Sequence, residues 1–139
     1  MTKRRKNLGI APDIFYDLDF CPVRSTYSKL SGKWVVLILT HLNFGTHRFS
    51  ELLAAIPDIS QRMLTQSVRL LERDGFVSRK VTASVPPRVD YSITEFGRDY
   101  LEELESILHW SLKNRAKIAA NQRDYDEMQN DRPAKRNSR

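Results

Sequence analysis

The sequence has one cysteine, five glycines and no long apolar run, and each shortage excludes a class of protein. A single cysteine cannot complete a structural zinc site, and the three histidines have no metal-like spacing. So few glycines form no phosphate-cradling loop. No apolar stretch approaches the roughly 20 residues that a membrane-spanning helix requires. We therefore expect no metal, no cofactor, no membrane partner, no enzymatic activity and a cytoplasmic location.

The net charge of +6 is concentrated at the two ends of the chain. Eight of the 23 basic residues lie there, which leaves 15 basic against 17 acidic residues in the body of a chain long enough for one domain. Residues 60–90 hold six basic and three acidic side chains, whereas residues 95–105 hold five acidic side chains and one basic. This polarity, more than the total charge, indicates an electrostatic footprint for nucleic acid.

Two short helical patterns follow one another, separated by a tight turn. Apolar residues fall on one helical face in Arg48–Ile56, and Pro57-Asp58 ends that pattern. Ser60 is placed to cap a second helix through Asp74, and Gly75 can take the left-handed conformation that ends a helix. The exposed face of the second helix carries side chains suited to base edges and phosphates. The candidate DNA contacts on this helix are Ser60, Gln61, Arg62, Thr65, Gln66 and Arg69.

A β-hairpin is predicted by the alternating apolar and polar residues of Val77–Val81 and Val89–Ile93. A helix, a tight turn, a polar-faced helix and a hairpin, in this order, make a winged helix-turn-helix, with double-stranded operator DNA as its leading partner. Arg88, at the end of the hairpin loop, is a further candidate DNA contact, with Arg79 and Lys80 able to hold phosphates. The alternative for Arg88 is an ion pair with a nearby carboxylate.

Further segments are expected before this unit. Residues 1–20 are predicted to form a basic tail followed by an arm, and for Leu8–Phe20 a short helix is the alternative to the arm. A helix is expected from Pro22 to about Leu30, because proline suits the first turn of a helix. The apolar run Trp34–Leu39 suits a buried strand or a buried helix, and its continuation towards Gly45 favours the helix.

A long helix is expected after the hairpin, with Thr94 as its cap. About 20 residues of helix span about 30 Å, and an apolar stripe of that length outruns the core of a small domain. This stripe suggests pairing with a second copy of the chain. The winged domain is therefore predicted to span residues 21–120, followed by a polar and basic, disordered tail over residues 121–139.

Six sequence segments stand in one specific order, and together they resemble the HxlR-type winged helix-turn-helix regulators, which are related to the MarR group. The segments are Cys21-Pro-Val-Arg, Gly32-Lys-Trp-Val-Val-Leu-Ile-Leu, Arg48-Phe-Ser-Glu-Leu, Ile59-Ser-Gln-Arg-Met-Leu-Thr-Gln, Leu71-Glu-Arg-Asp-Gly-Phe-Val and Val85-Pro-Pro-Arg-Val-Asp-Tyr-Ser-Ile-Thr-Glu-Phe-Gly. The resemblance implies a mainly α fold with a small β-hairpin (α+β) and additional N- and C-terminal dimerisation helices. It also implies a homodimeric transcription factor whose two recognition helices enter successive major grooves.

Cys21 is the candidate redox-sensing residue. It lies directly before a proline at the expected start of a helix, where the helix dipole favours a thiolate, and Arg24 can add a positive charge. The resemblance implies that a cysteine in this place often senses electrophiles or oxidants. Because it is the only cysteine, a resolving partner within the same chain is excluded. The alternative is a buried, inert cysteine, a common fate of a free thiol.

The predicted function is a dimeric, sequence-specific transcriptional regulator with a thiol switch at Cys21. A competing hypothesis is a winged-helix module that docks protein and has only non-specific nucleic-acid affinity from its basic ends. A thiol enzyme is disfavoured because no general base can be identified near Cys21 in the sequence.

Overall fold

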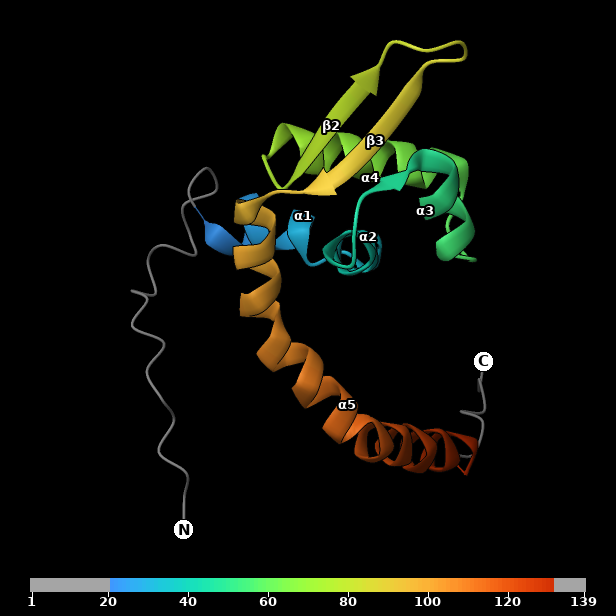
Figure 1. Cartoon of the computed structure of the whole chain (residues 1–139). Helices are drawn as coiled ribbons and strands as arrows, with labels where there is room; N and C mark the ends of the chain where they lie inside the picture. The colour runs from blue at the N-terminus through green and yellow to red at the C-terminus, as the bar shows by residue number, and fades with distance from the viewer. Residues whose placement is uncertain (1–20, 132–139) are drawn as a thin grey trace, which may run out of the picture. The chain divides into compact units, whose positions relative to one another are not determined.

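The computed structural model describes residues 21–131, which fall into two compact units divided after Leu101. The predicted arm at residues 1–20 and the end of the predicted tail, 132–139, lie outside the described residues. The elements (Figure 1) are a π-helical turn η2 (Val23–Tyr27), helices α1 (Ser28–Leu30), α2 (Lys33–Asn43), α3 (Phe49–Ala55), α4 (Gln61–Arg73) and α5 (Glu95–Asn130), and strands β1 (His47–Arg48), β2 (Val77–Thr82) and β3 (Arg88–Ile93). Within the described part, no helix is long and apolar enough to cross a membrane.

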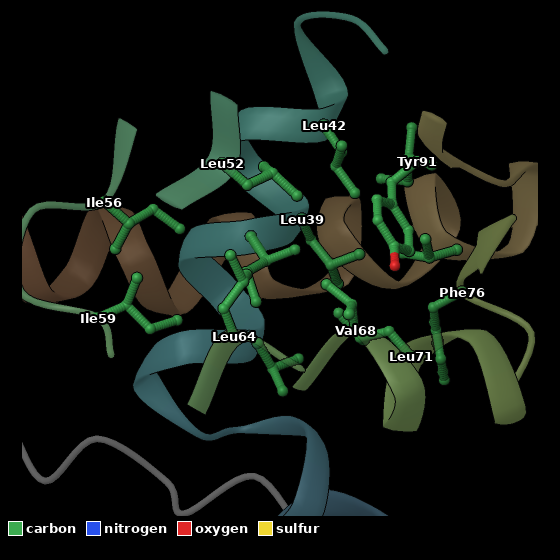
Figure 2. Close-up of a cluster of buried hydrophobic side chains, with 14 of the residues drawn as sticks. Leu39, Leu42, Leu52, Ile56, Ile59, Leu64, Val68, Leu71, Phe76 and Tyr91 are labelled. Atoms are coloured by element: carbon green, nitrogen blue, oxygen red, sulfur yellow. The ribbon is translucent and has the colours of Figure 1, made fainter. Parts of the chain in front are cut away.

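The core of the first unit forms around α2, which confirms the helical interpretation of the apolar run. Four of its residues are buried, and Ile38 and Leu39 are fully so. Side chains from α3, α4 and the sheet surround them, with Leu52, Leu64 and Tyr91 among the labelled residues of Figure 2. Within Trp34–Leu39 three residues are buried and the other three half-buried, which explains why the run shows no polar face.

The α3–turn–α4 unit forms as the sequence predicts. The Ser60 hydroxyl accepts a hydrogen bond from the Met63 N–H (3.1 Å), as expected of an N-cap. At the other end of α4, Gly75 has a φ of +84°. The Gly75 N–H donates to the Glu72 carbonyl and the Phe76 N–H to the Leu71 carbonyl, the pair of bonds that defines a Schellman motif. The recognition helix is therefore closed at both ends by its own sequence.

The sheet has three antiparallel strands in the order β1-β3-β2, one more than the predicted hairpin. The additional strand, β1, places His47 opposite Tyr91 and Arg48 opposite Asp90. Its position ties the start of α3 to the wing. The two predicted hairpin strands are each one residue longer than expected, and Thr82 pairs with Arg88 at the wing end.

The segment after Cys21 corrects the prediction of one regular helix from Pro22 to Leu30. It consists of the π-helical turn η2 followed by a single α-helical turn. A π turn holds more residues than an α turn, so the spacing that would place apolar residues on one α-helical face no longer does so. Val23 and Tyr27 are accordingly exposed, at 46% and 55%, and only Leu30 is buried in the core.

Helix α5 begins where predicted and ends later. The Thr94 hydroxyl accepts a hydrogen bond from the Gly97 N–H (3.0 Å) and donates one to the Gly75 carbonyl (2.7 Å), so Thr94 caps α5 and fixes its start to the end of α4. The helix runs to Asn130, over 36 residues rather than about 20, and includes residues 121–130 of the predicted tail. No glycine or proline occurs between Gly97 and residue 133, so nothing in the sequence stops the helix earlier.

The apolar stripe of α5 divides between the two units. Tyr100 and Leu101 are partly buried and pack against the core of the first unit. In the second unit, large apolar side chains are exposed along the helix, as the sequence predicts for a stripe that outruns its own core. They are Ile107, Leu108, Trp110, Leu112, Ile118, Tyr125 and Met128.

Candidate nucleic-acid interface

Helix α4 has one apolar face and one polar face. Leu64, Val68 and Leu71 are buried in the core. An α-helix advances about 100° per residue, which brings the predicted contacts to one side of α4, away from the buried face. Of these predicted contacts Gln61, Arg62, Gln66 and Arg69 are exposed, and Thr65 is half-buried.

The hydroxyl groups of Ser60 and Thr65 serve the helix itself. The Ser60 oxygen caps the first turn, and the Thr65 hydroxyl donates to the Gln61 carbonyl at 2.8 Å. By contrast, the long side chains of Arg62, Gln66 and Arg69 make no hydrogen bond or ion pair within the described part of the chain. Arginine can contact guanine and glutamine can contact adenine with two hydrogen bonds each. The groups suited to base contacts are therefore the ones that the fold leaves unoccupied.

A polar groove lies between α4 and the inner face of the sheet. It is lined by Phe49, Thr65, Val68, Arg69, Glu72, Arg79 and Tyr91. Arg79 is opposite Tyr91 in the sheet and thus shares the face that packs towards α4. The groove brings Arg69 of the recognition helix and Arg79 of the wing together, with Glu72 as the acidic member.

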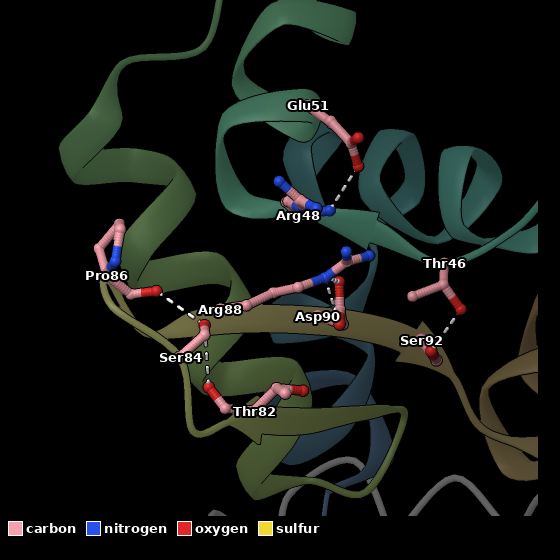
Figure 3. Close-up of polar contacts among 9 residues, drawn as sticks. All are labelled: Thr46, Arg48, Glu51, Thr82, Ser84, Pro86, Arg88, Asp90 and Ser92. Atoms are coloured by element: carbon pink, nitrogen blue, oxygen red, sulfur yellow. Dashed lines mark hydrogen bonds and ion pairs between the residues drawn. The ribbon is translucent and has the colours of Figure 1, made fainter.

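Arg88 forms the ion pair that the sequence left open as its alternative. Its Nε donates to both carboxylate oxygens of Asp90 at 3.0 Å (Figure 3). Arg88 and Asp90 are two residues apart on β3 and therefore on the same face of the sheet. Lys80, opposite Asp90 on β2, shares this outer face. The loop before Arg88 is held by the Ser84 hydroxyl, which donates to the Pro86 carbonyl at 2.8 Å.

Arg48 is a basic residue of the site that sequence reasoning missed. Its side chain is exposed, and its N–H donates to Glu51 Oε2 at 2.7 Å at the start of α3. A second groove joins this start to the wing tip and is lined by Arg48, Phe49, Ser50, Ser84, Pro86, Pro87, Arg88 and Val89. A basic residue just before the first helix of the motif was the available signal, but its closeness to Arg88 depends on the strand β1.

Cys21 is buried, at 1% exposed, and its thiol is free. Its carbonyl accepts hydrogen bonds from the N–H and the hydroxyl of Ser25, at 2.9 and 2.8 Å, so it precedes the first helical turn as predicted. Burial raises the pKa of the Cys21 thiol. Hydrogen bonds from the backbone N–H groups of Arg24 and Val23 and from the Arg24 side chain lower the pKa by more than burial raises it, so the net pKa lies below the ordinary value. The cysteine is thus both inaccessible and biased towards its reactive form.

Comparison with known proteins identifies the family. The family model for HxlR-like helix-turn-helix proteins matches residues 29–119. The chain is 40% identical over 118 residues to the HTH-type transcriptional regulator YdeP of Bacillus subtilis, covering 85% of this chain and 90% of that protein. Among solved structures, ytfH from Salmonella typhimurium matches with a TM-score of 0.68 and 36% identity, over 76% of this chain and 94% of the other. The redox regulator HypR in its reduced form matches with a TM-score of 0.65 and 40% identity, over 71% and 98%. The chain therefore belongs to the HxlR-like helix-turn-helix family and is a transcriptional regulator with a helix-turn-helix DNA-binding domain.

Proposed function

We propose that this regulator is a cytoplasmic homodimer that binds operator DNA through the outward face of α4 and through the wing, and that modification of Cys21 changes this binding. The observation that carries the proposal is the row of long side chains on α4, Gln61, Arg62, Gln66 and Arg69, which are exposed on one side of a helix whose opposite side is core. Two such helices presented by a symmetric dimer fit major-groove half-sites about 34 Å apart.

Replacement of Arg62 tests the sequence-reading role of α4. Arg62 lies in the first turn of α4, the end of a recognition helix that enters the groove. In Arg62→Ala we expect affinity for the operator, found by footprinting beside the protein's own gene, to fall by about 10- to 100-fold, with little change on random DNA. Arg98→Ala, an exposed arginine on α5, is the control and keeps operator affinity. Equal loss on operator and random DNA would instead assign Arg62 to a phosphate.

Support for a homodimer comes from the exposed apolar side chains of α5. Leu112 is 72% exposed and Trp110 is 55% exposed, and such residues in a row mark an interaction surface more often than a solvated face. In Leu112→Glu we expect a shift from dimer to monomer in analytical ultracentrifugation. Gln122→Glu adds the same charge at an exposed polar position and serves as the control. An unchanged dimer in Leu112→Glu would remove this part of α5 from the interface.

Support for a thiol switch comes from the lowered pKa of Cys21 and from the similarity to HypR, which is described as a redox regulator. Diamide takes two electrons and two protons from two thiols, so the disulfide must join Cys21 to a small thiol or to Cys21 of a second copy. We expect diamide with glutathione to change operator affinity, as followed by fluorescence anisotropy, and dithiothreitol to restore it. Cys21→Ser should bind DNA with an affinity that diamide does not change. An identical response in Cys21→Ser would exclude the switch.

A further inference from the structure

Asp90 is an acidic residue enclosed by basic ones on the outer face of the sheet. In the strand register it lies between Arg48 on β1 and Lys80 on β2, and Arg88 precedes it by two residues on its own strand. Direct cross-strand neighbours have Cβ atoms about 5 Å apart. Three of the four neighbours of Asp90 on this face are therefore positively charged, the fourth being Ser92 two residues further along β3, and Figure 3 shows Arg88 lying along β3 towards Asp90.

The ion pair between Asp90 and Arg88 uses only one of the three guanidinium nitrogens. Only Nε of Arg88 contacts the carboxylate, which leaves the four N–H groups of the two Nη atoms for another acceptor. The side chain of Asp90 is 15% exposed, whereas that of Arg88 is 48% exposed. The carboxylate is thus the more buried partner of the pair, and Arg88 lines the groove that Arg48, Ser50 and Ser84 also line.

An acidic residue in a surface that binds DNA carries a cost, because it repels phosphates. A partly exposed ion pair contributes little to folding stability, so stability alone does not account for Asp90. A held arginine, however, loses less rotamer freedom when it binds, and one immobilised long side chain changes affinity by about threefold to tenfold. Orientation of Arg88 is therefore a benefit that opposes the repulsion between Asp90 and phosphates.

We propose that Asp90 is a positioning residue for DNA binding: it holds the Arg88 guanidinium group by Nε, so that the Nη groups face a backbone phosphate in the groove between the start of α3 and the wing tip. Arg48 lines the same groove and supplies a second positive charge. This inference rests on the proposed function and extends it to two residues, Asp90 and Arg48, that were not among the predicted contacts.

A double-mutant cycle tests the inference, with a mixed-sequence duplex of about 30 base pairs as the probe. The slope of log K against log salt should fall by about 0.9 in Arg88→Ala, because one phosphate contact is lost. In the presence of Arg88, Asp90→Asn should weaken binding by about threefold to tenfold at high salt, where long-range repulsion is screened. In the Arg88→Ala background, Asp90→Asn should no longer weaken binding.

The outcomes separate this inference from the proposed function. If Asp90→Asn strengthens binding in both backgrounds, Asp90 is only a repelling charge and the inference is overturned, while the DNA interface stands. If Arg88→Ala has wild-type affinity and slope, Arg88 makes no phosphate contact and the inference fails, whereas the role of α4 is judged separately by Arg62→Ala. Asp99→Asn removes the same charge from an exposed position on α5 and is the matched control.

A measurement without DNA completes the test. In ¹⁵N NMR spectra, the Arg88 Nε–H should exchange slowly with water in the wild type and quickly in Asp90→Asn, with the remaining spectrum unchanged. Asp90→Ser provides a second variant if the first does not fold. Fast exchange of the Arg88 Nε–H in the wild-type protein would show that Asp90 does not hold the guanidinium group and would overturn the inference.

Discussion

Replacement of Gly97 by alanine is predicted to destabilise the protein, because Gly97 packs closely against Ile93 and against Phe76, which follows the end of α4. A Cβ added there would overlap the carbonyl oxygen of Phe76 and lie 2.8 Å from Cγ1 of Ile93. The Phe76 oxygen cannot retreat freely, because it accepts the Thr94 N–H at 3.0 Å. Gly97→Ala therefore forces a shift in the junction that holds the wing, the recognition helix and α5 together.

The expected size follows from three terms. Alanine favours the helix by about 1 kcal/mol over glycine. Overpacking costs about 1–3 kcal/mol, and loss of the backbone hydrogen bond costs about 1 kcal/mol. We expect Gly97→Ala to lower the free energy of unfolding by about 2 kcal/mol and Tm by about 10 °C.

Urea denaturation at one fixed protein concentration measures this change, since a dimer gains apparent stability with concentration. Arg98→Ala, at the next and exposed position of the same turn, should change the free energy of unfolding by less than about 0.5 kcal/mol. A Gly97→Ala protein as stable as the wild type, or more stable, would refute the reasoning, because helix propensity alone would then govern the site.

Three further predictions concern caps and charges. Ser60→Ala removes the acceptor at the start of α4 and should lower the free energy of unfolding by about 1 kcal/mol in urea. The hydrogen bond from Lys33 (2.7 Å) lowers the pKa of Asp58, so in Lys33→Met an NMR titration should find that pKa closer to its ordinary value. Because the pKa is lowered by folding, the stability from this pair is present above the ordinary aspartate pKa and is lost as pH falls through the folded value. Arg24→Met should raise the pKa of Cys21 and move its pH profile of alkylation by iodoacetamide to higher pH; an unmoved profile would remove the Arg24 side chain as a cause.

Local signals in the sequence were sufficient for the recognition helix. Ser60 as its cap and Gly75 as its end act through neighbouring backbone groups, and the period of its apolar residues identifies the buried face. For the same reason the polar face could be predicted before its environment was known. Whether each of its side chains contacts DNA stays a prediction.

Features that depend on distant parts of the chain could not be predicted. The strand β1 has only two residues, too few for a periodic pattern, and it exists because β3 pairs with it. The role of Arg48 in the groove depends on that pairing. The sequence left two partners open for Arg88, DNA and a nearby carboxylate. The structure was needed to identify Asp90 as that carboxylate. Helix α5 ends late because residues 98–130 contain no helix breaker. The polar composition after residue 120 predicted disorder, although polar residues can also form a helix.

The burial of Cys21 has a consequence for timing. Cys21 is 1% exposed, so its sulfur atom reacts only in the fraction of molecules in which local opening exposes it. The observed rate of its modification is then the intrinsic rate multiplied by the fraction of open molecules. Bulky reagents should react more slowly than small ones of equal oxidising power. Changes that increase this open fraction would thus accelerate the chemistry of this thiol, and changes at Val23 or Arg24 would also alter its acidity, because these residues hydrogen-bond to it.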